Sequence, residues 1–193
     1  MNYASIRTCD IANGEGVRVS LFVSGCRHHC PGCFNEEAQA FDYGKEFTRA
    51  VEDEILAALE PDFIAGLTLL GGEPMEPENQ RALLPFLRRF REKFGAKKTL
   101  WVYTGCILEK LSNYRIGELS NCGEENSKIR KFENSKIAYP WRCEVTDEFL
   151  GLTDVLVDGP FIESEKNISL RFRGSENQRI LELAGLRGGD GRD

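Results

Sequence analysis

Three cysteines stand close together in the segment "SGCRHHCPGCFN" at residues 24–35. Cys26, Cys30 and Cys33 follow the spacing CxxxCxxC, and clustered thiolates are typical ligands of zinc and of iron–sulfur clusters. Sites that only carry electrons, or that tie a fold together, usually have four ligands. Three thiolates would leave one iron of a [4Fe–4S] cluster with an open coordination position, which is typical of a catalytic metal. The spacing therefore favours one catalytic [4Fe–4S] cluster on these cysteines.

A structural zinc site is the alternative, with His28 or His29 as the fourth ligand. Structural zinc usually joins two separated ligand pairs, whereas both histidines lie between the first two cysteines and no second Cys/His pair follows downstream. Zinc is therefore the less favoured interpretation; separately, the family resemblance described below implies that both histidines are solvated loop residues beside the cluster. The remaining thiols are interpreted as small, partly buried residues or surface thiols, and they are Cys9, Cys106, Cys122 and Cys143.

A pair of glycines followed by an acid forms the segment "GGEP" at 71–74. A tight turn alone would explain Gly71 and Gly72, and Pro74 could end it. In the functional interpretation the glycines let backbone approach a ligand, while Glu73 accepts a hydrogen bond from an ammonium group. The preceding cysteine motif favours the functional interpretation.

Apolar, β-branched and aromatic runs predict the strands that position these residues. The predicted strands cover 17–25, 66–70, 99–105, 153–159 and 168–174. The first four are followed by, or end in, "SGCRHHC", "GGEP", "YTG" and "VDGPF". Since chemistry in parallel α/β folds gathers at the carboxyl ends of strands, this convergence predicts one site built from several strand ends.

Helical periodicity appears between the first strands. Residues 49–60 predict a helix with Thr48 as its N-cap, and 77–94 predict a second helix, kinked by Pro85 and stopped by Gly95. Strands that alternate with helices predict an α/β fold with a mainly parallel sheet, open or curled into part of a barrel.

Composition is that of a soluble globular protein of 193 residues, with 41% hydrophobic and 29% charged residues. A net charge of −6 gives no electrostatic support for nucleic acid or an anionic membrane as partner. With no bilayer-length apolar stretch and no signal peptide, we expect a cytoplasmic protein, whose clustered cysteines are not disulfides. We expect a single domain over 1–184 with an inserted loop region at 113–147, and a disordered tail at 185–193.

The cysteine motif after a strand, followed by Phe34 and the later "GGE", resembles the radical S-adenosylmethionine superfamily. The resemblance implies that the amino and carboxylate groups of S-adenosylmethionine chelate the open iron, and that the reduced cluster cleaves the sulfonium to a 5′-deoxyadenosyl radical. It implies that Gly71, Gly72 and Glu73 bind the methionyl amino group. The backbone of Gly32, Cys33 and Phe34 would lie near the adenine.

A narrower resemblance rests on "NGEGVRVSLFVSGC" (13–26), "VDGPF" (157–161) and "LRFRGSENQRI" (170–180). These segments resemble the activating enzymes of glycyl-radical proteins, and among them those that serve anaerobic ribonucleoside-triphosphate reductases. The resemblance implies a truncated, open (β/α) barrel whose uncovered side receives the reductase. It implies hydrogen abstraction from a glycine Cα of that reductase, with reduced flavodoxin or a similar protein as electron donor.

Within this resemblance, Arg171, Arg173 and Gly174 are interpreted as a contact to the partner or to the substrate carboxylate, or else as an edge strand with solvated charges. One alternative function is a small-molecule radical enzyme similar to the deazaguanine-forming synthases, which would need a dedicated polar pocket and a magnesium ligand near the cluster. Another is a simple iron–sulfur electron carrier, which would need neither "GGEP" nor the C-terminal segment.

Overall fold

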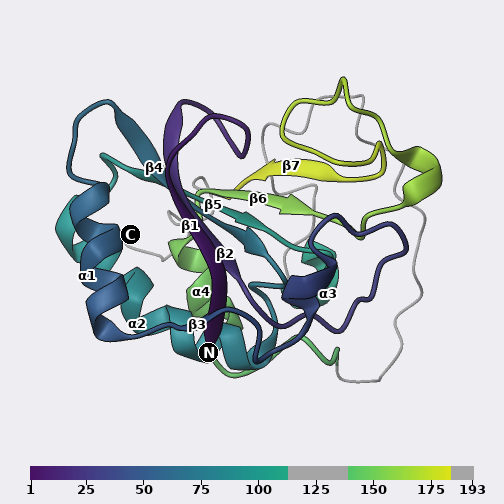
Figure 1. Ribbon diagram of the computed structural model, residues 1–193, viewed down its shortest axis with the longest axis horizontal. Helices are drawn as coiled ribbons and strands as arrows, with labels where there is room; N and C mark the ends of the chain where they lie inside the picture. Colours follow the sequence, from purple (N-terminus) through teal and green to yellow (C-terminus); the bar gives the residue numbers. More distant parts are fainter. Residues whose placement is uncertain (113–138, 184–193) are drawn as a thin grey trace, which may run out of the picture.

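The computed structural model describes residues 1–112 and 139–183, which form a mixed α/β fold around one seven-stranded sheet (Figure 1). The sheet order is β3-β1-β2-β4-β5-β6-β7. Its strands are β1 (Asn2–Asp10), β2 (Val17–Val23), β3 (Lys45–Glu46), β4 (Ile64–Gly71), β5 (Thr99–Tyr103), β6 (Val155–Asp158) and β7 (Arg179–Glu182). The α-helices are α1 (Arg49–Ala58), α2 (Pro77–Phe94), α3 (Leu108–Leu111) and α4 (Thr146–Leu152).

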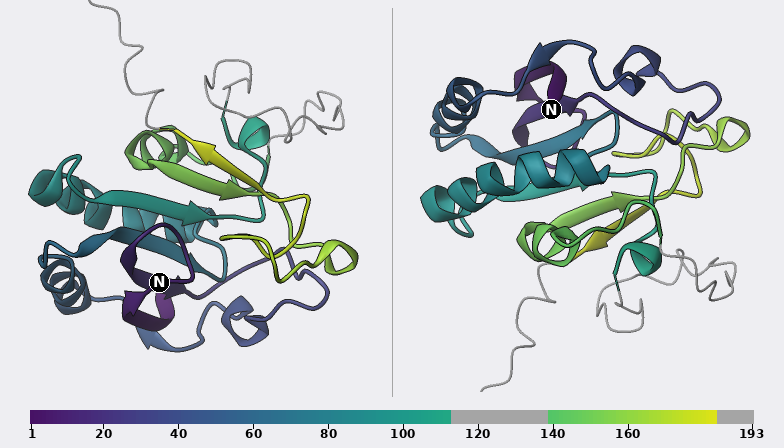
Figure 2. Two further views of the ribbon diagram at one scale, coloured as in Figure 1. Left: turned by 90° about the horizontal axis from the view of Figure 1, so that it is seen from above. Right: turned by 90° about the horizontal axis from the view of Figure 1, so that it is seen from below.

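The middle of the sheet is parallel, because β2 pairs with β4, β4 with β5, and β5 with β6 in the same direction. Viewed from below, α2 crosses in front of these strands with α1 and α4 on either side of it (Figure 2). The α/β prediction with mainly parallel central strands is confirmed. The outer pairs are antiparallel: β3 with β1, β1 with β2, and β6 with β7.

Burial explains why the central elements form. In β2, every residue after Val17 is buried, as expected for a strand covered on both faces. The face of α2 that meets the sheet carries Leu83, Leu87 and Phe90, all fully buried. The helix ends at Gly95, which has a φ of 54° and so adopts a backbone conformation that favours glycine.

The predicted helix bounds are confirmed within two residues. Thr48 is the N-cap of α1, although its side chain makes no capping hydrogen bond. Pro85 lies inside α2, and a kink there stays a prediction. The sequence did not indicate β1, because most of its side chains are exposed or half-buried and its apolar pattern is weak.

The predicted strand at 168–174 is wrong. This part of the chain is a loop of turns, and Phe172 has a φ of 58°, in the left-handed region that an extended strand cannot contain. Its polar groups bond within the loop instead of along a neighbouring strand. The side-chain oxygen of Gln178 accepts the N–H groups of Gly174 and Ser175 at 2.8 and 3.2 Å. The last strand, β7, begins only after this loop.

Much of the predicted insert and all of the predicted tail lie outside the described residues, which omit 113–138 and 184–193. Cys122 is therefore outside them as well. The described end of the insert, residues 139–145, is a turn that leads into α4. The boundaries predicted for the single domain stay a prediction.

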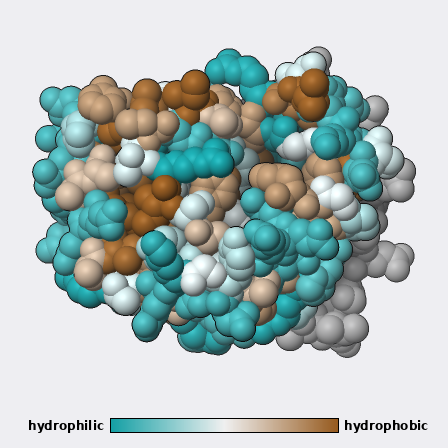
Figure 3. Space-filling model, in the orientation of Figure 1, coloured by the Kyte–Doolittle hydropathy of each residue, from teal (hydrophilic) through white to brown (hydrophobic). Residues whose placement is uncertain are grey.

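The face of the molecule that Figure 3 shows mixes hydrophilic and hydrophobic side chains. Hydrophobic side chains gather along its upper edge, over the loops that lie at the top of Figure 1. Those loops include large exposed residues, namely Ile11 between β1 and β2, Phe63 between α1 and β4, and Ile168 before β7. Among the described residues, no helix is both long and apolar enough to cross a bilayer.

Candidate active site

A cavity of about 350 Å³ lies at the carboxyl ends of the parallel strands. Its lining includes all three residues of the cysteine motif, Cys26, Cys30 and Cys33, together with 71–73 at the end of β4 and 103–105 at the end of β5. Residues from the long loop after β6 close the remaining side. The structure therefore brings the predicted strand-end segments to one place.

The loops at the strand ends are joined by hydrogen bonds between their backbones. The N–H groups of Gly72 and Glu73 donate to the carbonyl oxygens of Val23 and Gly25, each at 2.8 Å. A Cβ on Gly72 would lie 2.7 Å from the carbonyl oxygen of Gly25 and 2.8 Å from that of Ala38. Gly72 is therefore required for the close approach of this segment to the cysteine loop.

The three cysteines of the motif are half-buried free thiols. Burial raises the pKa of the Cys26 thiol to about 12, and the nearby backbone amides of His28 and His29 oppose this rise in pKa. Burial likewise raises the pKa of Cys30, and the nearby backbone of Phe161 in the "VDGPF" segment opposes this rise. The backbone near two of the sulfurs therefore acts in favour of the thiolate form that an iron–sulfur cluster requires.

Glu73 is almost completely buried, with 1% of the residue exposed. One carboxylate oxygen accepts the N–H of Met75 at 2.8 Å. The other accepts the N–H of Gly105 at 2.8 Å and lies 2.8 Å from Nε2 of His28. Glu73 thus joins its own turn to the loop after β5 and to the cysteine loop. Its predicted contact to an ammonium group stays a prediction, and the protein already supplies this carboxylate with three donors.

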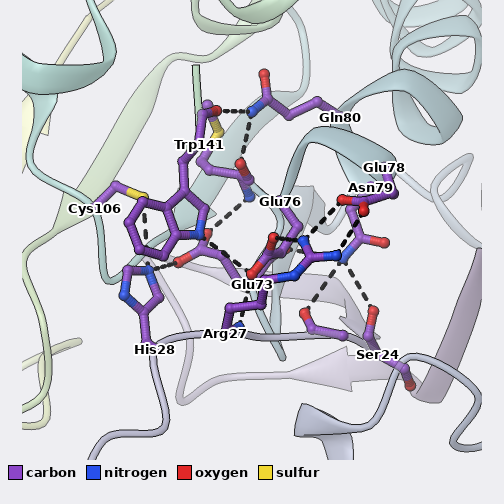
Figure 4. A network of polar contacts seen from close by, with 12 residues as sticks. Ser24, Arg27, His28, Glu73, Glu76, Glu78, Asn79, Gln80, Cys106 and Trp141 are labelled. Atoms are coloured by element: carbon purple, nitrogen blue, oxygen red, sulfur yellow. Dashed lines mark hydrogen bonds and ion pairs between the residues drawn. The ribbon is translucent and has the colours of Figure 1, made fainter. Parts of the chain in front are cut away.

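His28 is not the solvated loop residue that the sequence predicts, because only 13% of its side chain is exposed. Its imidazole stacks on the indole of Trp141, with ring centroids 4.5 Å apart and planes 6° from parallel, as Figure 4 shows. A Cβ on Gly105 would lie 2.8 Å from the imidazole, so that glycine makes room for the ring. The pKa of His28 is raised: burial alone would lower it, but the hydrogen bond and charge of Glu73 outweigh burial.

Arg27, the residue before His28, is held by a second buried carboxylate. Glu76 is 1% exposed and accepts the backbone N–H of Arg27 at 2.7 Å. It also pairs with the Arg27 guanidinium and accepts the indole N–H of Trp141 at 3.2 Å. Gln80 donates to the carbonyl oxygen of Trp141 at 2.7 Å. The network in Figure 4 therefore ties the cysteine loop to the start of α2 and to residue 141.

The histidines do not complete a zinc site with the three thiols. His28 Nε2 faces Glu73, and His29 Nδ1 lies 2.7 Å from the side-chain oxygen of Gln39. Within 1–112 and 139–183, the group compact enough for a single ion is His28, Glu73 and Cys106, in which Cys106 Sγ lies 3.6 Å from His28 Nε2. The arrangement does not support the zinc alternative.

The opposite side of the cavity has polar atoms without partners. Within the described residues, the phenol oxygen of Tyr103 and Nε of Arg173 are buried and make no hydrogen bond. Both residues line the cavity. Arg173 donates from another nitrogen, Nη1, to the carbonyl oxygen of Gln178 at 2.9 Å. Buried donors left unpaired in this way usually meet a ligand or water.

The remaining predicted residues lie around the mouth. Phe34 lines the cavity but leaves 79% of its surface exposed. Gly32 has a φ of 70°, and a Cβ there would lie 2.8 Å from the carboxyl carbon of Glu163. Arg171 is exposed and packs against the ring of Phe172.

Comparison with known proteins agrees with this site. A family described as "4Fe-4S single cluster domain" matches residues 12–181. The anaerobic ribonucleoside-triphosphate reductase-activating protein of Escherichia coli (strain K12) is 36% identical over 185 residues, which cover 95% of this chain and 99% of that protein. The chain belongs to this family of activating proteins. The protein of the same name from Haemophilus influenzae is 36% identical over 93% of this chain and 97% of its own length, and that of Enterobacteria phage T4 is 33% identical over 93% of each.

Sequence reasoning had missed several residues of this activating-protein site. Trp141 lay in the segment interpreted as an insert, and Glu76 and Gly105 carried no motif of their own. The one available signal in the sequence was the pair Glu73 and Glu76 just before a helix. Two carboxylates close to the cysteine loop would be expected to accept hydrogen bonds from it. Cys9 is exposed and Cys143 half-buried, as interpreted, whereas Cys106 is fully buried in the network.

Proposed function

We propose that this chain activates an anaerobic ribonucleoside-triphosphate reductase by generating a glycyl radical on it. The observation that carries the proposal is the set of three half-buried free thiols, Cys26, Cys30 and Cys33, which line one cavity at the strand ends. The chain also matches activating proteins along nearly their whole length. We assign the three thiols as ligands of one [4Fe–4S] cluster with an open iron position.

The chemical groups that line the cavity are suited to bind S-adenosylmethionine. The cofactor carries a carboxylate and ribose hydroxyls, and the unpaired donors of Arg173 and Tyr103 suit such acceptors. Together, cluster and cofactor would supply reductive cleavage of the sulfonium and the hydrogen-abstracting radical. The volume of about 350 Å³ is at the lower end of the usual range for ligand sites.

The chain's own residues would orient the cofactor and exclude water. We assign the segment Gly71, Gly72 and Glu73 to the amino group of the cofactor and the backbone of Gly32, Cys33 and Phe34 to its adenine. Glu73 would act mainly by holding the loops around the cofactor, since its two oxygens already accept three donors. Arg173 would hold the carboxylate through a charge-assisted bond.

The partner would enter on the side where the loop after β6 and Phe34 form the mouth. The curved sheet would correspond to a truncated, open barrel, which leaves space there for a glycine-bearing loop of the reductase. Arg171 is exposed on that loop and would contact the partner. Reduced flavodoxin or a similar donor would supply the electron, and the reaction would take place in the cytoplasm.

The test is an anaerobic assay of the reconstituted protein for cleavage of S-adenosylmethionine, with and without the reductase of the same organism. We expect 5′-deoxyadenosine formation by the wild type and by Cys143→Ser, and none by Cys26→Ala. Wild-type protein that holds a cluster but forms no 5′-deoxyadenosine under either condition would contradict the proposal.

A further inference from the structure

Three side chains of the types that bind metal ions meet beside the cysteine loop, and none of them belongs to the cysteine motif. Nε2 of His28 lies 2.8 Å from a carboxylate oxygen of Glu73 and 3.6 Å from Sγ of Cys106. Within 1–112 and 139–183, one ligand atom from each of these residues lies within 4.8 Å of the other two. Figure 4 shows the imidazole facing both the carboxylate and the thiol. Imidazole, carboxylate and thiolate are the donors that zinc uses in proteins.

Hydrogen bonds alone do not satisfy this group, because the carboxylate and the thiol face the same ring nitrogen. Nε2 carries at most one proton, so it can give a full hydrogen bond to only one of them. Without that proton, it would present a lone pair to the oxygen of Glu73. The arrangement also differs from a nucleophilic triad, in which the thiol and the carboxylate meet opposite nitrogens of the ring. A metal ion between the three atoms would bind all of them.

Burial and charge favour a divalent ion at this place. Glu73 is 1% exposed and Cys106 is fully buried, while the side chain of His28 is 13% exposed. A buried carboxylate beside a buried thiolate would be costly without a compensating charge. One dication balances one carboxylate and one thiolate, so the group as a whole would be neutral.

We propose that His28, Glu73 and Cys106 bind one zinc ion through Nε2, a carboxylate oxygen and Sγ. The thiol proton, and the proton of Nε2 where it carries one, pass to solvent when zinc binds. Because His28 and Glu73 line the cavity, a water molecule from it can take the fourth position. The inference goes beyond the proposed function and does not rest on it, since the three thiols of the motif are not involved.

Contacts within the protein hold each ligand in place. Each oxygen of Glu73 accepts a backbone N–H at 2.8 Å. The imidazole stacks on the indole of Trp141. The backbone of Cys106 is fixed at both of its polar groups, because its N–H donates to the hydroxyl oxygen of Thr104 at 3.0 Å and its carbonyl oxygen accepts the N–H of Gly159 at 2.8 Å. Outer contacts of this kind orient the ligands of metal sites.

The experiment adds equimolar zinc chloride to the cluster-reconstituted protein without oxygen and removes unbound zinc by gel filtration. Zinc and iron contents are then measured, together with the X-ray absorption fine structure at the zinc edge. Since the motif thiols can also bind zinc, the number of sulfur neighbours identifies the site. We expect about one zinc per chain, with a single sulfur neighbour at about 2.3 Å and nitrogen or oxygen neighbours at about 2.0–2.2 Å, and unchanged iron content.

Cys106→Ala removes the sulfur ligand, and Cys143→Ser is the matched control because it changes a thiol outside the group. Loss of an outer partner typically lowers metal affinity about 10–100-fold, so loss of a ligand should lower zinc affinity at least about a hundredfold. Competition with a chelating dye measures the affinity, and Cys143→Ser should match the wild type. Should Cys106→Ala fail to fold, the sulfur count in the wild type decides alone.

A wild-type protein that retains no zinc, or whose zinc does not have a single sulfur neighbour, would overturn the inference. Equal zinc affinity of the wild type and folded Cys106→Ala would also overturn it. None of these measurements involves S-adenosylmethionine or the reductase. A protein that binds zinc as expected but never cleaves S-adenosylmethionine would therefore end the proposed function and leave the zinc site standing.

Discussion

The two sides of the cavity use their polar groups in opposite ways. On the anchored side, formed by residues 26–30 with Glu73, Glu76 and Trp141, buried carboxylates accept backbone and side-chain donors from several elements. On the open side, formed by Tyr103 and the loop 159–178, buried donors remain without partners. A side with its hydrogen bonds made suits a permanent cofactor, whereas unpaired donors suit a ligand that comes and goes.

The largest effect should come from removing a cluster ligand on the anchored side. In Cys30→Ala the cluster loses one of three thiolates, and no other thiol of the loop can replace it. We expect loss of the iron–sulfur chromophore and of all cofactor cleavage. Iron and sulfide analysis after anaerobic reconstitution checks this, and full activity in the variant would show that Cys30 is not a ligand.

The open side is tested by Arg173→Ala. Loss of a charge-assisted hydrogen bond costs about 1.5–3 kcal/mol, so we expect affinity for S-adenosylmethionine to fall by roughly one to two decades while the cluster remains. Anaerobic equilibrium dialysis measures this. Arg171→Ala is the control, because that side chain is exposed and stacks on Phe172. Equal affinities for wild type and Arg173→Ala would remove Arg173 from the cofactor site.

Glu73→Gln tests the anchored side alone, because it removes a buried carboxylate there and leaves all three cysteines unchanged. The amide would turn one acceptor into a donor that faces other donors, in a site with 1% exposure. We expect a loss of about 1–3 kcal/mol in the free energy of unfolding of the apoprotein. Chemical denaturation measures it, with Glu78→Gln as control, since that acid is 51% exposed and pairs with Arg27 at the surface. Equal losses in the two variants would contradict the anchoring role.

The smallest effect is expected at Cys143. Its thiol donates to the side-chain oxygen of Gln80 at 3.5 Å, and a serine hydroxyl can replace that weak bond. Cys143→Ser should keep wild-type iron content and cofactor cleavage. A loss of iron comparable to that of Cys30→Ala would reveal a second metal site in this part of the chain.

Much of the fold could be predicted because, in the centre of the sheet, the local sequence pattern of each segment agrees with the structure that it adopts. The runs that became β2, β4, β5 and β6 are apolar and end at recognisable turns, so the strands themselves and the convergence of their ends followed from the sequence. The strand predicted at 168–174 was wrong because the alternating sequence pattern of this loop resembles that of a strand. Its conformation depends on Gln178 and on the left-handed Phe172, which no local pattern indicates.

The candidate site was predictable where residue type alone specifies chemistry, as with three clustered cysteines. It was not predictable where a role arises from distant contacts. Trp141 lies far along the chain from His28, and only the folded structure places the indole on the imidazole. Glu73 illustrates the same limit, because its acidity suggested a ligand contact while three donors within the protein occupy its oxygens.

The most direct test of the account is the electron paramagnetic resonance spectrum of the reductase after anaerobic incubation with this protein, S-adenosylmethionine and a low-potential reductant. We predict a glycyl-radical signal on the reductase with wild-type protein and with Cys143→Ser, and none with Cys30→Ala. A reductase that stays free of the radical, although the wild-type protein holds its cluster and cleaves the cofactor, would contradict the central claim.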